Sequence, residues 1–232
     1  MKKKYWLLLL ICAVLLNIGS AMADDGFYVV AVGGGVGTKI TSLPYTISTP
    51  GFYYLGKDLT STGYGITINV DNVTIDLMGF SLNGSGGLVL EGISMYGRKN
   101  VEVRNGTVRA FYYGIREQYA EGANHRIVNV RILNNIQTGI YLGGSNHLIK
   151  GCAVSDNSNG GIDLQGSGSV IGNMVYTSSG TGINLSTSTS APIFVDKNTV
   201  SGTATHYSGG STATVWGMNA GSPPYMNYPT PY

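Results

Sequence analysis

A short phrase that begins with Gly-Ile recurs six times along the chain and limits the folds available to it. The phrase starts at Gly65, Gly92, Gly114, Gly139, Gly161 and Gly182, at intervals of 27, 22, 25, 22 and 21 residues. A repeat of this length is typical of a solenoid, in which each period forms one unit that packs against its neighbours. We therefore expect stacked coils around one elongated core.

The residues inside each period predict strands and no helices. Apolar and polar residues alternate in short runs bounded by Gly, Asn and Ser, which is the pattern of half-buried strands. A second phrase occurs at 73–77, 101–104, 127–130, 149–152 and 170–173, and a third short run at 80–82, 107–108 and 153–154. No period contains the ten or more residues of helical pattern that a leucine-rich or tetratricopeptide repeat needs. The fold class predicted is all-β, a parallel β-helix with coils of about 21–27 residues.

The phrase Asn72-Val73-Thr74-Ile75-Asp76-Leu77 and the recurring Asn-x-x-Gly-Ile resemble those of a known group. They are similar to the right-handed parallel β-helix repeat proteins of the pectin lyase-like superfamily, including NosD-like periplasmic proteins. The resemblance covers residues 62–203 and implies a single-stranded right-handed parallel β-helix. Its motifs are those of a coil, so it implies a fold far more specifically than a function.

The first 23 residues predict export. Lys2, Lys3 and Lys4 precede 12 apolar residues at 5–16, and small residues follow up to Ala23. These are the three regions of a secretory signal, and the apolar run is shorter than the roughly 20 residues of a membrane span. We expect a signal peptide at 1–23, cleavage after Ala23, no membrane span in the mature chain, and a periplasmic or extracellular location.

Removal of the signal also changes the charge balance. Three of the 14 basic residues lie in it, which leaves 11 against 12 acidic residues. A mature chain with a net charge of about −1 gives no reason to expect nucleic acid or an acidic membrane surface as a partner. Cys152 is the single cysteine after residue 23, so no internal disulfide is expected, and its place in the second phrase suits a small core side chain.

Composition divides the mature chain into three parts. Residues 24–61 lack the Gly-Ile phrase and are predicted to be an N-terminal cap, because the first coil of a solenoid would otherwise expose its edge. The β-helix is predicted at 62–203. Residues 204–232 are predicted to be a C-terminal cap or tail whose Pro/Tyr-rich end is either disordered or a docking segment, since proline cannot continue a ladder.

The residue between the two inward positions of each Gly-Ile phrase points outward. These residues are Thr67, Ser94, Arg116, Tyr141, Asp163 and Asn184. Coils stack about 4.8 Å apart, so we expect one continuous outward row. An aromatic ring beside a cation, a carboxylate and an amide suits sugar recognition, which combines stacking with hydrogen bonds to hydroxyls. The candidate ligand-binding residues are thus Arg116, Tyr141, Asp163 and Asn184, with a solvated sheet surface as the alternative.

The sequence indicates no catalytic residues, metal site or cofactor. Glycoside hydrolysis needs two carboxylates about 5 to 10 Å apart, and Asp163 has no second acid beside it in the row. The acidic cluster that would hold calcium in a pectate-type lyase is also missing. His125 and His147 each follow an asparagine and are expected to stack at a turn, with no Cys, Met or carboxylate at ligand spacing.

Three further expectations concern single positions. Glu117 interrupts an inward column, where a carboxylate would be costly, so we expect the strand to end early and Glu117 to turn outward before the polar insertion 118–124. Asp76, Arg104, Arg131 and Ala153 are expected to form one outward row of the second phrase, in which Asp76 and Arg104 pair as an exposed ion bridge. Asn173 and Asn198 hold matching places, which the resemblance implies is an asparagine ladder.

Three functions remain open from sequence. The first is an exported, non-catalytic β-helix that binds a polysaccharide or a cell-surface protein along one sheet face. The second is a polysaccharide lyase or glycoside hydrolase of the pectin lyase-like type. The third is a purely structural envelope or appendage protein. Scarce charge and unpaired carboxylates favour the first and third, and the oligomeric state is not predicted.

Overall fold

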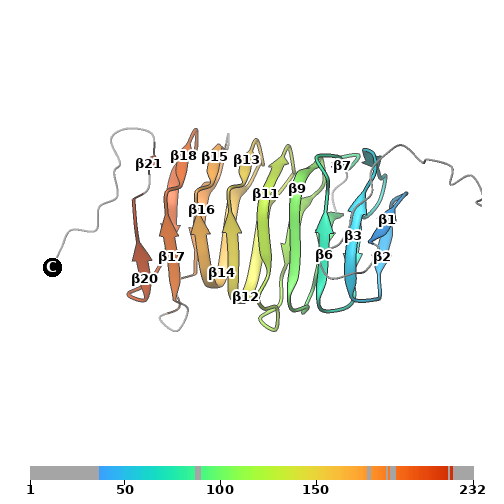
Figure 1. Ribbon diagram of the computed structural model, residues 1–232. Helices are drawn as coiled ribbons and strands as arrows, with labels where there is room; N and C mark the ends of the chain where they lie inside the picture. Colours follow the sequence, from blue (N-terminus) through green and yellow to red (C-terminus); the bar gives the residue numbers. More distant parts are fainter. Residues whose placement is uncertain are drawn as a thin grey trace, which may run out of the picture.

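The computed structural model describes residues 37–86, 90–176, 179–186, 188, 192–218 and 220–221. This part of the chain contains 21 strands, all paired in parallel, that wind into an elongated solenoid (Figure 1). The described residues include no helix with the length and apolarity that a membrane span requires. The all-β parallel solenoid predicted from the repeat is confirmed.

Each coil contributes a strand to three parallel sheets, which we name the Gly-Ile face, the second face and the third face. The Gly-Ile face contains β2 (Tyr45–Ile47), β5 (Ile66–Ile68), β8 (Glu91–Ser94), β10 (Tyr113–Glu117), the first parts of β12 (Thr138–Lys150) and β14 (Gly160–Ile171), β16 (Thr181–Leu185) and β19 (Thr205–Gly209).

The other two faces are built the same way. The second face contains β1 (Thr38–Ile40), β3 (Gly51–Leu55), β6 (Val73–Asp76), the first parts of β9 (Val101–Arg109) and β11 (Arg126–Leu133), the ends of β12 and β14, β17 (Ile193–Asp196) and β20 (Thr214–Trp216). The third face contains β4 (Leu59–Thr60), β7 (Ser81–Asn83), the ends of β9 and β11, β13 (Ala153–Ser155), β15 (Met174–Tyr176), β18 (Thr199–Ser201) and β21 (Ala220–Gly221).

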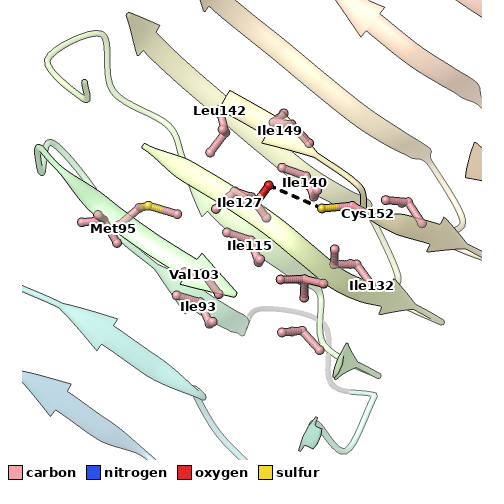
Figure 2. Close-up of a cluster of buried hydrophobic side chains, with 14 of the residues drawn as sticks. Ile93, Met95, Val103, Ile115, Ile127, Ile132, Ile140, Leu142, Ile149 and Cys152 are labelled. Atoms are coloured by element: carbon pink, nitrogen blue, oxygen red, sulfur yellow. Dashed lines mark hydrogen bonds between the residues drawn. The ribbon is translucent and has the colours of Figure 1, made fainter. Parts of the chain in front are cut away.

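The core is a column between these sheets. Successive isoleucines of the Gly-Ile phrase pair in strict register, from Ile115 to Ile140, Ile162 and Ile183, and each is buried. Figure 2 shows Ile93, Ile115 and Ile140 facing the same interior as Val103, Ile127 and Ile149 of the second face. Each fully buried isoleucine stabilises the fold by about 2 kcal/mol, so this register is a main source of stability.

Close approach between coils explains why a glycine precedes each isoleucine. A Cβ at Gly114 would lie 2.5 Å from the carbonyl oxygen of Gly139, and one at Gly139 would lie 2.8 Å from the side chain of Asn157. Backbone and side chains of the next coil already occupy that space. Glycine is therefore required at this corner by packing rather than by an unusual φ.

Asparagines hold the coils together at two kinds of corner. Asn72, Asn100, Asn124 and Asn146 have φ between 58° and 61°, and their exposed amides form a chain of hydrogen bonds of 2.7, 2.9 and 2.7 Å. Asparagine tolerates this left-handed conformation better than other non-glycine residues. The same amide also supplies both a donor and an acceptor to the coils on either side.

A second set of asparagines is buried inside the solenoid. The Asn173 amide donates to Asn198 Oδ1 at 2.9 Å, which confirms the predicted ladder. A pair that the sequence analysis missed, Asn135 and Asn157, is joined in the same way at 2.8 Å. The buried Cys152 lies beside the ladder of Asn173 and Asn198, and its backbone N–H donates to Asn173 Oδ1 at 2.9 Å. Burial raises the pKa of its thiol to about 11, in keeping with a core side chain.

The ends of the chain lie partly outside the described residues. The predicted signal peptide at 1–23, the first part of the predicted cap at 24–36, and the Pro/Tyr-rich end at 222–232 lie there. The rest of the predicted cap forms β1 to β4. Within it β1 pairs with β3, and β2, β3 and β4 pair in register with β5, β6 and β7 of the following coils. Residues 38–60 thus continue the ladders of all three faces.

Candidate functional site

The structure brings the four candidate ligand-binding residues into one row on the Gly-Ile face. Arg116 of β10 pairs with Tyr141 of β12, Tyr141 with Asp163 of β14, and Asp163 with Asn184 of β16. The backbones of neighbouring members are therefore about 4.8 Å apart, which is the spacing between hydrogen-bonded strands. All four side chains are half-buried, so each is partly covered by its neighbours and is not freely solvated.

Arg116 lies inside a cluster of tyrosines. Its guanidinium carbon is 4.0 Å from the ring centroid of Tyr113, 5.7 Å from that of Tyr96 and 5.9 Å from that of Tyr141. Its Nη1 pairs with Glu91 Oε1 at 3.0 Å, and Nε is buried with no hydrogen-bond partner among the described residues. Arg116 is thus a cation that packs among aromatic rings and is already paired with a carboxylate.

The Glu91 carboxylate joins two members of this cluster. The Tyr96 hydroxyl donates to Glu91 Oε1 at 2.6 Å, so one carboxylate oxygen serves both Tyr96 and Arg116. Burial first, and then this hydrogen bond, raises the pKa of Tyr96 well above its usual value. Tyr119 packs edge-on against Tyr96 with 5.5 Å between ring centroids, and itself is exposed. Charge pairs and ring contacts thus hold the positions of these tyrosines.

Asp163 and its amide partners form the other half of the row. Asn184 Nδ2 and Gln165 Nε2 both donate to Asp163 Oδ1, at 3.1 and 2.5 Å. Burial raises the pKa of Asp163, and these two hydrogen bonds oppose the rise. Burial, and then the charge of Asp163, also raises the pKa of the Tyr141 hydroxyl. Tyr141 therefore presents a ring between an aromatic cluster and a small polar network.

Glu91, Tyr96 and Tyr113 were missed by the sequence analysis. A signal for two of them was present, because Glu91 and Tyr113 stand just before the glycine of their phrases and pair with each other across coils. That position also points outward and lies beside the row of candidate residues. Tyr96 follows the phrase in a turn, and nothing in the repeat distinguishes it.

The carboxylates on this face are too far apart for glycoside hydrolysis. Glu91 aligns with Tyr113, then Thr138, then Gly160, which places Glu91 three coils from Asp163, or about 14 Å along the stack. The two-carboxylate mechanism requires about 5 to 10 Å. Among the described residues, no group of three or more His, Cys, Asp and Glu side chains has an arrangement that would hold a metal ion.

A family model described as "Right handed beta helix region" matches residues 59–219. The chain belongs to this right-handed β-helix family. The match covers most of the chain and agrees with the parallel solenoid, and it supplies the right-handed sense of the coils. No curated protein and no solved structure matches the chain.

Glu117 departs from what the sequence predicted for this β-helix protein. It does not turn outward: it stays in β10 opposite Leu142 and is fully buried. Its carboxylate accepts hydrogen bonds from the backbone N–H groups of Gly97, Arg98 and Tyr119, at 3.0, 3.3 and 2.7 Å. These donors replace water, so the inward position is tolerated. Glu117 thereby anchors the turn that carries Tyr119 to the face.

The two predicted stacking histidines lie beside Glu117. The rings of His125 and His147 are 5.0 Å apart and inclined by 10°, which confirms the stack, and both are buried. The expectation that no carboxylate accompanies them was wrong, because His125 Nε2 lies 3.5 Å from Glu117 Oε2. Glu117 and His125 are eight residues apart in the sequence, and the insertion at 118–124 between them folds back so that their side chains meet.

The outward row predicted on the second face was only half right. Arg104 Nε pairs with Asp76 Oδ2 at 2.8 Å, as predicted, although Asp76 is mostly buried. Arg131 is not in that row, because Arg104 aligns with Val128, whereas Arg131 aligns with Thr107 and Ala153 on the third face. In these coils the chain turns from the second face to the third face a few residues earlier than the sequence analysis assumed.

Proposed function

We propose that this β-helix protein binds carbohydrate along the Gly-Ile face without chemical turnover. The observation that carries the proposal is the surroundings of Tyr141. Its half-exposed ring has the Tyr113 and Arg116 cluster on one side and the Asp163, Asn184 network on the other. A sugar ring can stack on such an aromatic face while its hydroxyls exchange hydrogen bonds with the carboxylate and amides.

Regular spacing supports a polymeric rather than a single-sugar ligand. The outward row extends to Ser94 and Thr67 beyond Arg116 and to Ser208 beyond Asn184. Small hydroxylated side chains thus continue the row at both ends and leave the surface low there. An extended chain could lie along the stack and contact several coils.

We also propose that the protein acts outside the cytoplasm. The support is the tripartite pattern of residues 1–23, with its three lysines, apolar run and small residues before position 24. Cell fractionation with N-terminal sequencing of the mature chain tests this, and a mature chain that begins at Met1 in the cytoplasm would contradict it.

A glycan array, followed by calorimetry on the best ligand, tests binding. Replacing Tyr141 by Ala is expected to weaken binding by about 1–3 kcal/mol, or roughly five- to 150-fold. The matched control is Tyr176→Ala, which removes an exposed tyrosine from the third face and should leave binding unchanged. Equal losses in both variants, or no glycan signal from the wild type, would refute the proposal and favour a protein partner or a structural role.

Depolymerisation assays with and without calcium test turnover. No sustained product is expected from any polysaccharide that binds, because the face lacks a carboxylate pair at the required separation. Sustained product formation that Asp163→Asn abolishes would establish the enzyme instead.

A further inference from the structure

The outward side chains of the second face change character halfway along the solenoid. In its N-terminal half the outward rows begin with Phe52 and Tyr54 and continue as an ion-pair network. Arg104 contacts Asp76 and Glu102 at 2.8 and 3.0 Å, and Arg126 contacts Glu102 at 2.9 Å. The next coils replace most of these charges by apolar residues and keep Lys150 and Asp196. Figure 1 shows β14, β17 and β20 of this face side by side toward the C-terminal end.

Five apolar residues are distributed over five coils in two adjacent outward rows. One outward row contains Leu148, Ser169, Phe194 and Val215, which pair in that order. The adjacent outward row contains Val128, Lys150, Ile171 and Asp196. Phe194 and Val215 are 39% and 59% exposed, and the other apolar members are half-buried. We name the residues of these two rows the apolar stripe.

Such a stripe calls for a partner surface. Outward positions of a solvated sheet are normally polar, and contiguous exposed apolar residues mark interaction sites. The polar network in the first half of the same face shows that this sheet is not apolar by default.

The order of residues in the stripe is complementary to itself. Consider a two-fold axis that passes along the strand direction through Ile171. It places Ile171 against Ile171 of a second copy and Ser169 against Ser169, with the coil axes antiparallel. It brings Leu148 opposite Phe194, and Lys150 opposite Asp196. Gly217, the residue after the Val195 partner Trp216, faces Val128, and Arg126, which precedes Leu148 in its row, faces Val215, where its aliphatic stem can cover the valine.

We propose that the apolar stripe is the interface of an antiparallel homodimer of this chain. The charge order Lys150, Ile171, Asp196 singles out a second copy as the occupant, because a two-fold turns one lysine and one aspartate into two intermolecular ion pairs. Among the described residues, the Asp196 carboxylate lies 3.9 Å from Lys197 Nζ and accepts a hydrogen bond from the Met218 N–H, and its side chain is 18% exposed. An interface of five coils is small, so the dimer is expected to form in the micromolar range.

Sedimentation velocity over a concentration series measures the association. The wild-type mature chain is expected to pass from monomer to dimer, and Phe194→Asp to stay monomeric at every concentration. Thr74→Asp is the matched control, because Thr74 lies outward on the same face in the polar half. Lys150→Glu should weaken the dimer about tenfold or more by repelling Asp196. Circular dichroism checks that each variant keeps the β-helix.

Cysteine cross-linking tests the two-fold axis itself. Ile171→Cys should form a covalent dimer alone, because residue 171 meets its own copy. Leu148→Cys and Phe194→Cys should cross-link efficiently when mixed and poorly when separate. Cys152 is buried and does not interfere. A wild type that is monomeric throughout, a dimer that survives Phe194→Asp, or a Thr74→Cys variant that cross-links as well as Ile171→Cys would each overturn the proposal.

Discussion

Acidification is expected to destabilise the β-helix through His147. In the folded protein His147 Nδ1 accepts a hydrogen bond from the backbone N–H of His125 at 3.2 Å, and Nε2 donates to the carbonyl oxygen of Gly143 at 2.9 Å. One ring nitrogen must therefore stay unprotonated. A proton on Nδ1 would point at a backbone donor in a buried site, and the folded structure offers no acceptor for it there.

The size of the effect follows from the pKa of His147. Burial first, and then the neighbouring His125, lowers it from an ordinary 6.5 to about 4, against the opposing influence of the Gly143 carbonyl and Glu117. The unfolded chain takes up the proton near pH 6.5, whereas the folded chain resists until about pH 4. Stability is therefore complete above pH 6.5 and falls as the pH drops. The loss is about 2 kcal/mol between about pH 7.5 and pH 5, and about 3 kcal/mol at lower pH.

Urea unfolding at a series of pH values, followed by Trp216 fluorescence or circular dichroism, measures this loss. His147→Asn is the informative variant, because an amide oxygen can still accept the His125 N–H but cannot titrate. It should be less stable near neutral pH and lose less on acidification. The raised pKa of Asp163 acts with the opposite sign, since its folded form holds a proton more readily. An acid-dependent loss of equal size in wild type and His147→Asn would refute the role assigned to His147.

Two further predictions concern the forces that hold the coils in register. Ile140→Ala should lower the free energy of unfolding by about 2–5 kcal/mol, because it leaves a cavity in the column of isoleucines. Ile140→Val should lower it by about 1 kcal/mol. Equal denaturant midpoints for the two variants would contradict this. Asn157→Ala should cost about 1–3 kcal/mol by leaving the buried donors of Asn135 unpaired. Asn146→Ala in the exposed ladder should cost less, and the reverse order would show that the buried pair is not what joins the coils.

The fold could be predicted because one phrase fixes many contacts at once. Once Ile140, Ile162 and Ile183 are aligned, every residue between them is assigned a coil, a face and an inward or outward direction. The observed register agrees with that assignment along the whole Gly-Ile face. The same alignment correctly stacked His125 on His147 and Asn173 on Asn198, because each pair occupies equivalent places.

Contacts that do not follow the repeat could not be predicted. Glu117 was expected to turn outward because an inward carboxylate without partners is costly. The cost is real, but it is met by backbone donors at residues 97 and 98 of the preceding coil and at Tyr119. Those N–H groups belong to irregular turns whose direction no side-chain pattern encodes. The burial argument predicted the wrong direction for the Glu117 side chain because the sequence does not reveal the backbone N–H donors around it.

Arg116 shows how this limit affects the candidate site. Its place in the outward row was predicted, but its charge is already paired with Glu91 and covered by three tyrosine rings. An arginine so engaged is a poor primary contact for a ligand hydroxyl, although it makes the ring positions rigid. In the proposed binding mode, the polar contacts are therefore expected mainly from Asp163 with its two amide partners, and the stacking from Tyr141. Arg116→Lys should accordingly disturb binding by loosening the rings, since a lysine ammonium cannot stack flat against Tyr113.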